Sequence, residues 1–306
     1  NNLCRELLKL GYKVKALTYK DTRALSGLDI TKVKGDLDDE VTGNDLIKDA
    51  DIVFHLAAVI SIEGDKKGLL KKINIEGTRR IVEASLKVKV KRFIHFSSIH
   101  ALSQFPLDKE LTEENPLVGD EGFAYDRSKA EAERIVLNAV KKGLDAVIIN
   151  PTSVVGPNDF KPSFVGEVIT KVANGKLPAL IPGGFDWVDV RDIVKGTITA
   201  IEKGRAGERY LLSGNWCDIV DLVTEINKHT GRKNPIKLPT WVARVGVPFM
   251  KLHSKIKNTQ PLYTNESLTI LKESNKRVSN SKAIQELDYT VTTFETTIKD
   301  TYNWFK

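Results

Sequence analysis

The stretch FAYDRSKAEAERIVLNAVKKGLDAVIINP, residues 123–151, carries the pattern that decides the fold. From Phe123 to Lys142 apolar residues recur at helical spacing, and Gly143 ends the helix. The run from Leu144 to Ile149 has the composition of a buried parallel strand, which Pro151 ends. A helix followed directly by such a strand is typical of parallel sheets that are covered by helices.

The same alternation runs through the first half of the chain. It predicts an α/β fold with a Rossmann-type, doubly wound parallel sheet. The expected helices are residues 2–10, 44–49 and 67–87, and the expected strands are residues 13–18, 31–35, 51–56 and 92–96.

The second half has a different organisation. Glycine, proline and aromatic residues concentrate between residues 156 and 187. We expect four prolines there to break regular structure, namely Pro157, Pro162, Pro178 and Pro182. We expect a nucleotide-binding domain from residues 1–155, to which residues 186–213 return. Residues 156–185 and 214–306 would form a smaller, mainly helical substrate-binding region. Its patterns, with the returning segment, predict helices at 190–202, 219–230, 241–253, 265–272 and 294–305 and a strand at 209–212.

Composition narrows the class of protein. The 306 residues are 41% apolar and 28% charged, as in an ordinary globular protein. The 47 basic and 40 acidic residues give a net charge of +7, which suits either an anionic cofactor or substrate or simply a lysine-rich surface. No run of basic residues is interleaved with aromatic residues, so we expect no nucleic-acid partner.

Other classes of site are also not expected. No apolar run approaches the roughly 20 residues of a membrane span, so no membrane partner is expected. Cys4 and Cys217 make no disulfide framework, which favours a reducing cytoplasm. The five histidines show no ligand-like spacing, so no metal is expected.

Tyr125 and Lys129 are the first candidate site. Four residues apart on a helix, their side chains share a face. A nearby cation favours phenolate, so we expect Lys129 to lower the pKa of Tyr125 and suit it to acid–base chemistry. Tyr302 and Lys306 have the same spacing, so the spacing alone does not decide.

Several motifs along the chain resemble those of the extended short-chain dehydrogenases/reductases. The resemblance is to the dihydroflavonol 4-reductase-like, NAD-dependent epimerase/dehydratase group. The matching segments are Gly35-Asp36-Leu37, residues 55–58 (HLAA), residues 74–78 (NIEGT), Phe96-Ser97-Ser98, Tyr125 with Lys129, residues 150–157 (NPTSVVGP) and residues 183–192 (GGFDWVDVRD).

The resemblance implies a catalytic set of Ser98, Tyr125 and Lys129. Tyr125 would transfer the proton, Ser98 would bind the reacting oxygen, and Lys129 would tune Tyr125 and hold the nicotinamide ribose. Ser97 is the neighbouring alternative to Ser98, and either serine could be merely structural.

The resemblance also implies how a dinucleotide would be held. Asp36 would hold its adenine end beside Leu37, and the backbone of residues 56–58 would lie close to it. Asn74 would brace the neighbouring strand or cap a helix. The implied cofactor-binding set is Tyr19, Lys20, Asp36, Leu37, Leu56, Ala57, Ala58, Asn74, Tyr125, Lys129, Pro151, Thr152, Ser153 and Val154.

The family's first strand and its glycine-rich loop have no counterpart here. That loop cradles the pyrophosphate at a helix N-terminus. Residue 1 already lies in the helix that should follow the loop, so we expect the sequence to be incomplete at its start. The absent strand would lie between the strands at residues 13 and 51.

The expected cofactor is NADP, with NAD left open. NAD-preferring members end the second strand with an acidic residue that binds the ribose. This chain has Tyr19 and Lys20 there, which favours NADP, whereas the following Asp21 keeps NAD open.

The expected substrate is a small molecule with a carbonyl or alcohol group. Where sugar-nucleotide enzymes of the family place an asparagine and a diphosphate-binding arginine, this chain has Ser153 and Phe185. Phenylalanine cannot replace a bidentate phosphate contact. The tentative substrate residues are Ser98, Asp159, Phe160, Phe164, Phe185 and Trp187, although the aromatic ones could equally be core.

We therefore expect an NAD(P)-dependent oxidoreductase that reduces a ketone or aldehyde. One alternative is a nucleotide-sugar epimerase or dehydratase with tightly bound NAD, and another is a non-catalytic NAD(P)-sensing protein. By analogy with the family, a homodimer could form through the helices at residues 67–87 and 123–142.

Overall fold

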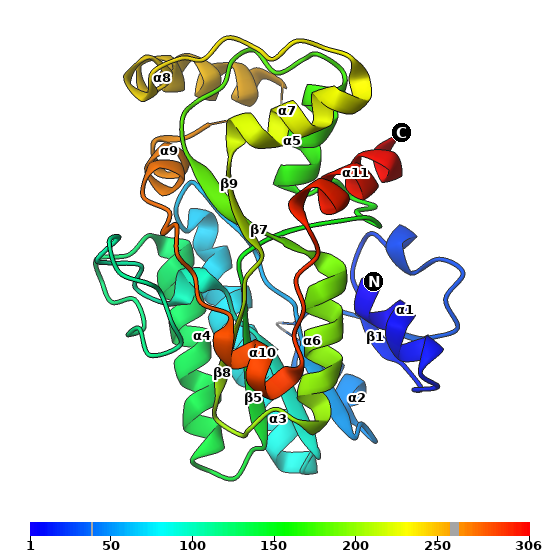
Figure 1. Ribbon diagram of the computed structural model, residues 1–306. Helices are drawn as coiled ribbons and strands as arrows, with labels where there is room; N and C mark the ends of the chain where they lie inside the picture. The colour runs from blue at the N-terminus through cyan, green and yellow to red at the C-terminus, as the bar shows by residue number, and fades with distance from the viewer. Residues whose placement is uncertain (38, 258–262) are drawn as a thin grey trace.

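A parallel sheet of four strands forms the centre of the lower part of the molecule in Figure 1. The computed structural model describes residues 1–37, 39–257 and 263–306. The strands lie in the order β3 (Ile52–His55), β4 (Arg92–Phe96), β5 (Ala146–Pro151) and β8 (Arg209–Leu212). Each neighbouring pair is parallel, so the predicted parallel α/β sheet is confirmed.

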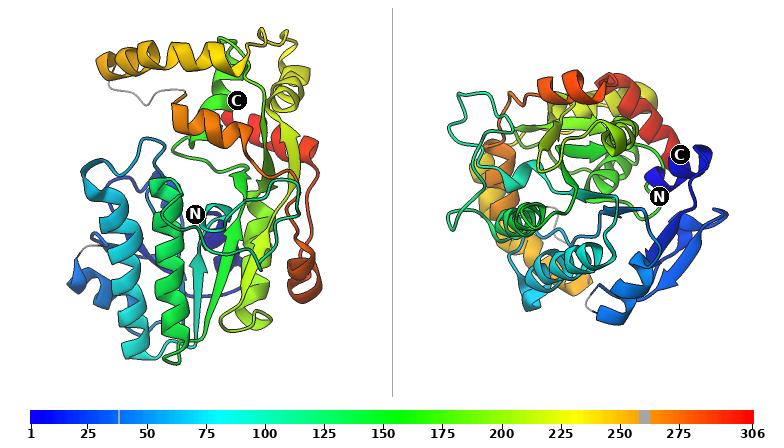
Figure 2. Two further views of the ribbon diagram at one scale, coloured as in Figure 1. Left: turned by 90° about the vertical axis from the view of Figure 1, so that its left-hand side faces the viewer. Right: turned by 90° about the horizontal axis from the view of Figure 1, so that it is seen from below.

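Helices cover both faces of this sheet. Figure 2 shows α3 (Thr78–Val88) and α4 (Ala124–Val140) on one side and α6 (Val190–Glu202) on the other. Phe93 packs in the core towards α3 and α4, and its neighbour Ile94 packs in the core towards α6. Since successive strand residues face opposite sides, both faces of β4 are buried, as predicted for a doubly wound sheet.

The N-terminal segment forms a separate pair of strands. β1 (Lys15–Thr18) and β2 (Thr31–Lys34) are parallel to each other. In the described residues no strand pairing joins them to β3. The helix α1 (Asn2–Lys9) packs Leu3 and Leu7 against α6. Short elements complete this half: η1 (Arg23–Leu25), α2 (Glu40–Ile47), η2 (Lys66–Gly68), the π-helical η3 (Leu70–Gly77) and η4 (Ile99–Ala101).

A second, smaller sheet organises the upper part of the molecule. β7 (Gly184–Asp189) pairs in parallel with β6 (Ser153–Val155) and antiparallel with β9 (Asn215–Asp218). The sequence patterns predicted neither β7 nor α5 (Phe164–Ala173). The four prolines expected to break regular structure do lie outside the described helices and strands; they are Pro157, Pro162, Pro178 and Pro182. The domain boundaries themselves stay a prediction.

The remaining helices surround this small sheet or extend from it. Figure 1 places α8 at the top, above α9, and α11 beside β7. The sequence patterns predicted four of these helices but not α10, which packs on the large sheet beside α6. Their bounds are α7 (Ile219–Thr230), α8 (Thr240–Lys257), α9 (Asn265–Lys272), α10 (Ser281–Leu287) and α11 (Phe294–Phe305).

Gly214 is required where the chain passes from β8 to β9. A Cβ there would lie 1.9 Å from the carbonyl oxygen of Trp187, and backbone cannot yield as a flexible side chain can. We therefore expect Gly214→Ala to lower the free energy of unfolding by about 2–3 kcal/mol in urea titrations. The matched control is Gly246→Ala in α8, where a Cβ meets nothing within 4 Å. It should stabilise the helix by about 0.5–1 kcal/mol, and equal effects of the two changes would contradict this account.

Candidate active site

The first turns of α4 place Tyr125 and Lys129 at the carboxyl ends of the central strands. Lys129 is buried, and its Nζ donates to the carbonyl of Phe96 over 2.7 Å. Phe96 is the last residue of β4, so the lysine is tied to the strand that leads into Ser98. The fold thus brings together three residues that the motifs only place along the sequence.

Ser98 is the serine that faces the phenol. Its side chain hydrogen-bonds Tyr125, and its Oγ also accepts the backbone N–H of His100 over 3.2 Å. The Oγ of Ser97 is buried and has no hydrogen-bond partner in the described part of the chain. Of the two serines, Ser98 has the position that acid–base chemistry at Tyr125 requires.

Burial controls the protonation of both catalytic candidates. It raises the pKa of Tyr125 to about 12, against the opposing hydrogen bond of Ser98. It lowers the pKa of Lys129 to about 8, against the opposing charge of Glu133. The expectation of a lowered Tyr125 pKa is wrong for this structure, because desolvation raises it and the charge of Asp126 raises it further. A protonated phenol suits a proton donor.

A buried polar network, not predicted from the sequence, lies beneath these residues. Asn150 at the end of β5 donates from Nδ2 to the carbonyl of Ser98 and to Glu133, each over 3.0 Å. The carboxylate of Glu133 is fully buried and pairs with Arg209 of β8. The signal in the sequence was a glutamate four residues after Lys129, on the face of α4 that the lysine marks as buried.

His100 and Asp126 flank Tyr125 and were also missed. Their Nδ1 and Oδ1 atoms lie 3.3 Å apart, and the His100 ring meets the Tyr125 ring edge to face at 5.9 Å. Burial raises the pKa of Glu266 in α9, and the charge of Asp126 raises it further. The wall of the site therefore carries ionisable groups from both parts of the molecule.

Asn74 braces the chain just beyond β3. Its Oδ1 accepts the N–H of Val59 over 2.7 Å, and its Nδ2 donates to the Val59 carbonyl and to Ser128 Oγ, each over 2.9 Å. It lies inside η3 and caps no helix, so the capping role is wrong. Its contacts hold the chain that follows β3, and the expected bracing of the strand itself stays a prediction. Its place in direct cofactor binding stays a prediction.

The carboxyl edge of the sheet offers a surface that fits a dinucleotide. Leu56, Ala57 and Ala58 follow β3 and are exposed, although they are apolar. Val154 is 38% exposed beyond β5. Open apolar chain at this edge of a parallel sheet is where such cofactors bind. Leu37 differs from expectation, since it is buried in the core between the sheet and α3, whereas Asp36 is half-buried.

The loop after β5 is held in place by Asp186. The hydroxyl of Thr152 donates to Asp186 Oδ1 over 2.6 Å, and so does the N–H of Gly214. Pro151 and Ser153 are half-buried on either side of Thr152. The segment from Pro151 to Val154 is thus fixed at the edge where the resemblance puts the nicotinamide.

Comparison with known proteins identifies the family. A model of the NAD dependent epimerase/dehydratase family matches residues 1–213. The chain belongs to this family. Its members and relatives are NAD-dependent reductases, dehydratases and epimerases of the extended short-chain type, and the resemblance stated from the motifs is confirmed.

Two relatives match over the whole of this chain. Sterol demethylase protein B of Methylococcus capsulatus is 33% identical and is covered over 94% of its length. A putative dihydroflavonol 4-reductase of Synechocystis sp. is 30% identical and is covered over 91%. The crystal structure of gox2253 has a TM-score of 0.85 at 30% identity, with 99% of this chain and 93% of that chain aligned.

A third relative matches only in part. A dTDP-glucose 4,6-dehydratase of Mycobacterium tuberculosis is 30% identical over 65% of this chain and 62% of its own.

The end of β1, which selects between NAD and NADP in this family, is basic. Tyr19 is exposed, and the Nζ of Lys20 lies 5.1 Å from the centre of its ring. Asp21 pairs with Arg23 over 2.6 Å, so its carboxylate is already engaged. These contacts leave no free carboxylate at Asp21, although cofactor choice stays a prediction.

The tentative substrate residues do not form one aromatic cleft. Trp187 is buried and meets Phe185 edge to face at 5.5 Å within the core of the upper part. Phe160 instead packs against Trp304 at 4.9 Å. Asp159 accepts the N–H of Ser163 at the start of α5, and Phe164, the first residue of that helix, is exposed. Of the two interpretations, core packing is therefore the correct one for Trp187.

The duplicate pair at the C-terminus is structural. The ring of Tyr302 stacks on His229 at 5.7 Å, in the core between α7 and α11. A tyrosine followed four residues later by a lysine thus occurs twice in this chain. Only the pair on α4, Tyr125 and Lys129, lies beside Ser98.

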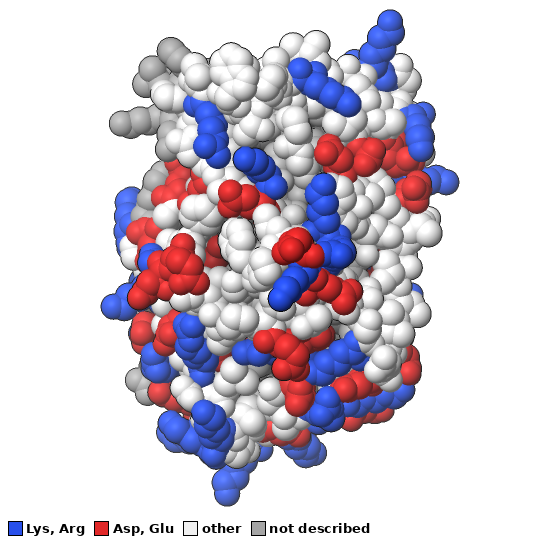
Figure 3. Space-filling model, turned by 60° about the vertical axis from the view of Figure 1, so that its left-hand side comes forward, with Lys and Arg blue, Asp and Glu red and all other residues white. Residues whose placement is uncertain are grey.

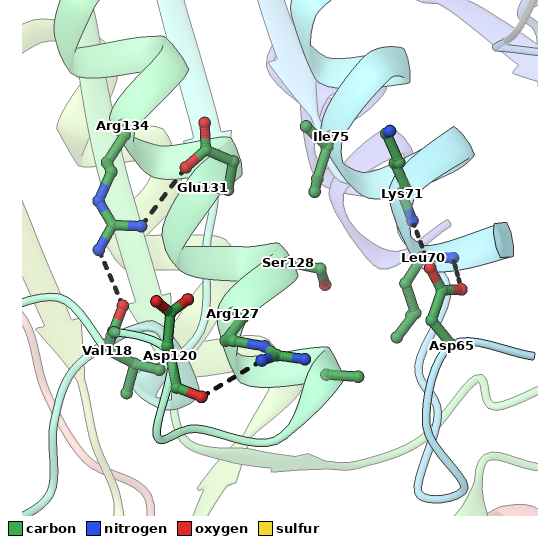
Figure 4. A pocket seen from close by; sticks show the side chains of 12 residues that line it. Asp65, Leu70, Lys71, Ile75, Val118, Asp120, Arg127, Ser128, Glu131 and Arg134 are labelled. Carbon is green, nitrogen blue, oxygen red and sulfur yellow. Dashed lines mark hydrogen bonds and ion pairs between the residues drawn. The ribbon is translucent and has the colours of Figure 1, made fainter.

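A cavity of about 440 Å³ lies beside α4, and Tyr125 is not among the residues that line it (Figure 4). It is lined by residues of both α4 and η3, and Ser128 is one of them. Its rim carries Asp65 and Lys71 on one side and Arg127 and Glu131 on the other. The homodimer expected through these helices stays a prediction.

Two kinds of feature are absent from the described residues. No helix there is long and apolar enough to cross a membrane. Within the same residues no cluster of three or more histidine, cysteine or acidic side chains is placed to hold a metal ion. Cys4 and Cys217 are both free thiols.

From the lowered pKa of Lys129 we predict how the free energy of unfolding depends on pH. With a folded pKa of about 8 and an unfolded value of 10.5, burying the charge costs roughly 3 kcal/mol below pH 8. That cost shrinks as the pH rises from 8 to 10.5. Lys129→Met should therefore stabilise the nucleotide-free protein by roughly 2 kcal/mol at pH 7, after about 1 kcal/mol for the lost hydrogen bond, and by progressively less towards pH 10.

Urea unfolding at several pH values measures this difference. The control is Lys142→Met, because Lys142 is exposed and the same change there should have no pH-dependent effect. If the Lys129→Met protein is less stable than the parent at pH 7, then burying the ammonium group of Lys129 does not destabilise the folded state.

Proposed function

We propose that this chain is an NAD(P)-dependent reductase of ketones or aldehydes, which also oxidises the corresponding alcohols. The observation that carries the proposal is the half-buried Tyr125, hydrogen-bonded to Ser98 and one helical turn from Lys129. The bound nicotinamide supplies or accepts the hydride. Tyr125 gives its proton to the substrate oxygen, Ser98 donates a hydrogen bond to the same oxygen, and Lys129 holds a positive charge beside them.

We further propose a bulky apolar substrate. Both relatives that match the whole chain are named for sterol or dihydroflavonol chemistry. The match to the dTDP-glucose dehydratase covers 65% of the chain. Phe185 is largely in core contact and offers no cation to a diphosphate. An apolar ring system that carries the reacting oxygen fits these observations better than a sugar nucleotide.

A second candidate is a sugar-nucleotide epimerase or dehydratase. The 30% identity to the dTDP-glucose dehydratase favours it, and so does the ionisable pair His100 and Asp126 beside Tyr125. Thermal stabilisation by dTDP- or UDP-sugars but not by steroid or flavonoid ketones would support this candidate. The reverse pattern supports the reductase. A non-catalytic role is not retained, because the family consists of enzymes and the catalytic set is intact.

Replacing Tyr125 by Phe tests the reaction. We expect turnover to fall by about 10²–10⁴-fold, because the proton donor is lost while the ring stays in place. Nucleotide affinity, measured by fluorescence titration, should change less than about twofold. The matched control is Tyr302→Phe, which removes a hydroxyl at the same spacing from a lysine and should retain full activity. Undiminished turnover in the Tyr125 variant would refute the assignment.

We propose NADP as the preferred cofactor, supported by Lys20, Arg23 and the engaged Asp21. Lys20→Ala should raise the Kd for NADPH about tenfold, the loss of one charged phosphate contact, and leave the Kd for NADH nearly unchanged. Lys13→Ala is the control, since Lys13 is an exposed lysine at the opposite end of β1. Equal weakening of both cofactors would argue against a 2′-phosphate contact.

A further inference from the structure

The outward face of α8 is apolar, where a surface helix in water is ordinarily polar. Trp241, Val245 and Pro248 recur at helical spacing and are all exposed. Trp241 is 69% exposed and Val245 is 63% exposed, and Ile236, just before the helix, is 67% exposed. The opposite face carries Val247 into the core with α9. One apolar face of α8 therefore packs in the core, and a second apolar face is exposed to solvent.

The segment around α8 also carries the excess charge of the protein. Residues 226–265 contain eight lysines and arginines and no acidic residue. Because the whole chain carries +7, the remainder is close to neutral. Lys228 pairs with Glu225, which lies just before this range, over 2.5 Å. In the described residues, no ion pair involves the other exposed basic side chains of the segment, which are Arg232, Lys233, Lys237 and Arg244. The upper end of the molecule in Figure 3 accordingly shows white and blue atoms and no red ones.

We propose that this face docks on an anionic phospholipid membrane, with α8 lying in the plane of the interface. We define the α8 surface as Ile236, Lys237, Trp241, Arg244, Val245 and Pro248. Its apolar side chains would enter the boundary between headgroups and acyl chains, and its basic ones would meet the phosphates. Tryptophan favours this depth, because its ring is amphipathic. In this arrangement α8 lies at the membrane surface and does not span the bilayer.

Charge and composition select this occupant over two others. A second copy of the chain would bring two strongly basic segments together, which repel each other. Single-stranded nucleic acid would match the charge, but it is held by stacking on several aromatic side chains. Among the exposed apolar residues of the α8 surface only Trp241 is aromatic, and Ile236 and Val245 gain nothing from a phosphodiester. An anionic bilayer satisfies both the charge and the aliphatic groups.

Vesicle co-sedimentation with the full chain tests the proposal. We expect binding to phosphatidylcholine vesicles that contain phosphatidylglycerol, little binding without it, and release at about 0.5 M salt. Trp241→Ser with Val245→Ser should weaken binding at least about tenfold, because two inserting side chains are lost. Lys233→Glu with Lys237→Glu should weaken it at least about twentyfold, from roughly 1 kcal/mol per basic residue.

Matched controls separate this surface from general effects. Phe105→Ser removes a 61% exposed aromatic residue elsewhere, and Lys141→Glu with Lys142→Glu makes the same charge change at the C-terminal end of α4. Both should bind vesicles like the parent. Tyr125→Phe should also bind normally, so that failure of the proposed reaction and failure of membrane docking are distinguishable.

Tryptophan fluorescence gives a second readout. Anionic vesicles should shift the emission to the blue, and Trp241→Phe should abolish most of the shift while retaining vesicle binding. The proposal is overturned if the parent binds no anionic vesicles, or if Trp241→Ser with Val245→Ser binds them unchanged. It is also overturned if single-stranded RNA binds more tightly at equal salt, or if the double serine variant converts a dimer to a monomer in sedimentation velocity.

Discussion

The buried carboxylate of Glu133 is the constraint on which the catalytic geometry depends. A charge without exposure must be paired and hydrogen-bonded, or the fold loses several kcal/mol. Its partners, Arg209 on β8 and Asn150 on β5, fix α4 against two strands of the sheet. Asn150 also holds the carbonyl of Ser98. One polar network therefore sets the helix that carries Tyr125 relative to the serine that binds it.

The parallel sheet was predictable because burial on both faces leaves a direct mark on the sequence. β5 begins with an apolar run, and α4 is bounded by Gly143 and followed at once by this strand. The small sheet left no such mark. β6 is three residues long, and each of its residues pairs with a residue of β7 that lies 34 positions later in the sequence, beyond a segment rich in prolines and glycines. Its strands form through non-local pairing, which a local pattern does not encode.

The candidate site divides in the same way. Motifs along the chain identified Ser98, Tyr125 and Lys129, and the fold joins them. The direction of the Tyr125 pKa was wrong, because a spacing of four residues predicts proximity but not desolvation. For the same reason, the sequence left two interpretations of Trp187, as a core residue or as part of a substrate cleft. Exposure depends on what other segments cover a residue, and so the sequence identifies groups more reliably than their electrostatic state.

The placement of charge changes how the net charge of +7 is understood. Taken as an average over the whole chain, a net charge of +7 is consistent with a positive electrostatic field that attracts an anionic cofactor. The excess instead lies in residues 226–265, in the upper part of the molecule, so a field averaged over the whole chain does not describe the charge near the sheet. α9 connects the two regions: it packs under α8, and Thr264, its N-cap, donates to the carbonyl of Ile62. Since Glu266 in the first turn of α9 is close enough to Asp126 for their charges to interact, a contact at α8 is only one helix away from the wall of the active site. If the proposed substrate resides in a bilayer, it would leave the membrane at α8. It would then be on the same side of the enzyme as the active site, where Tyr125 and Ser98 would bind its reacting oxygen.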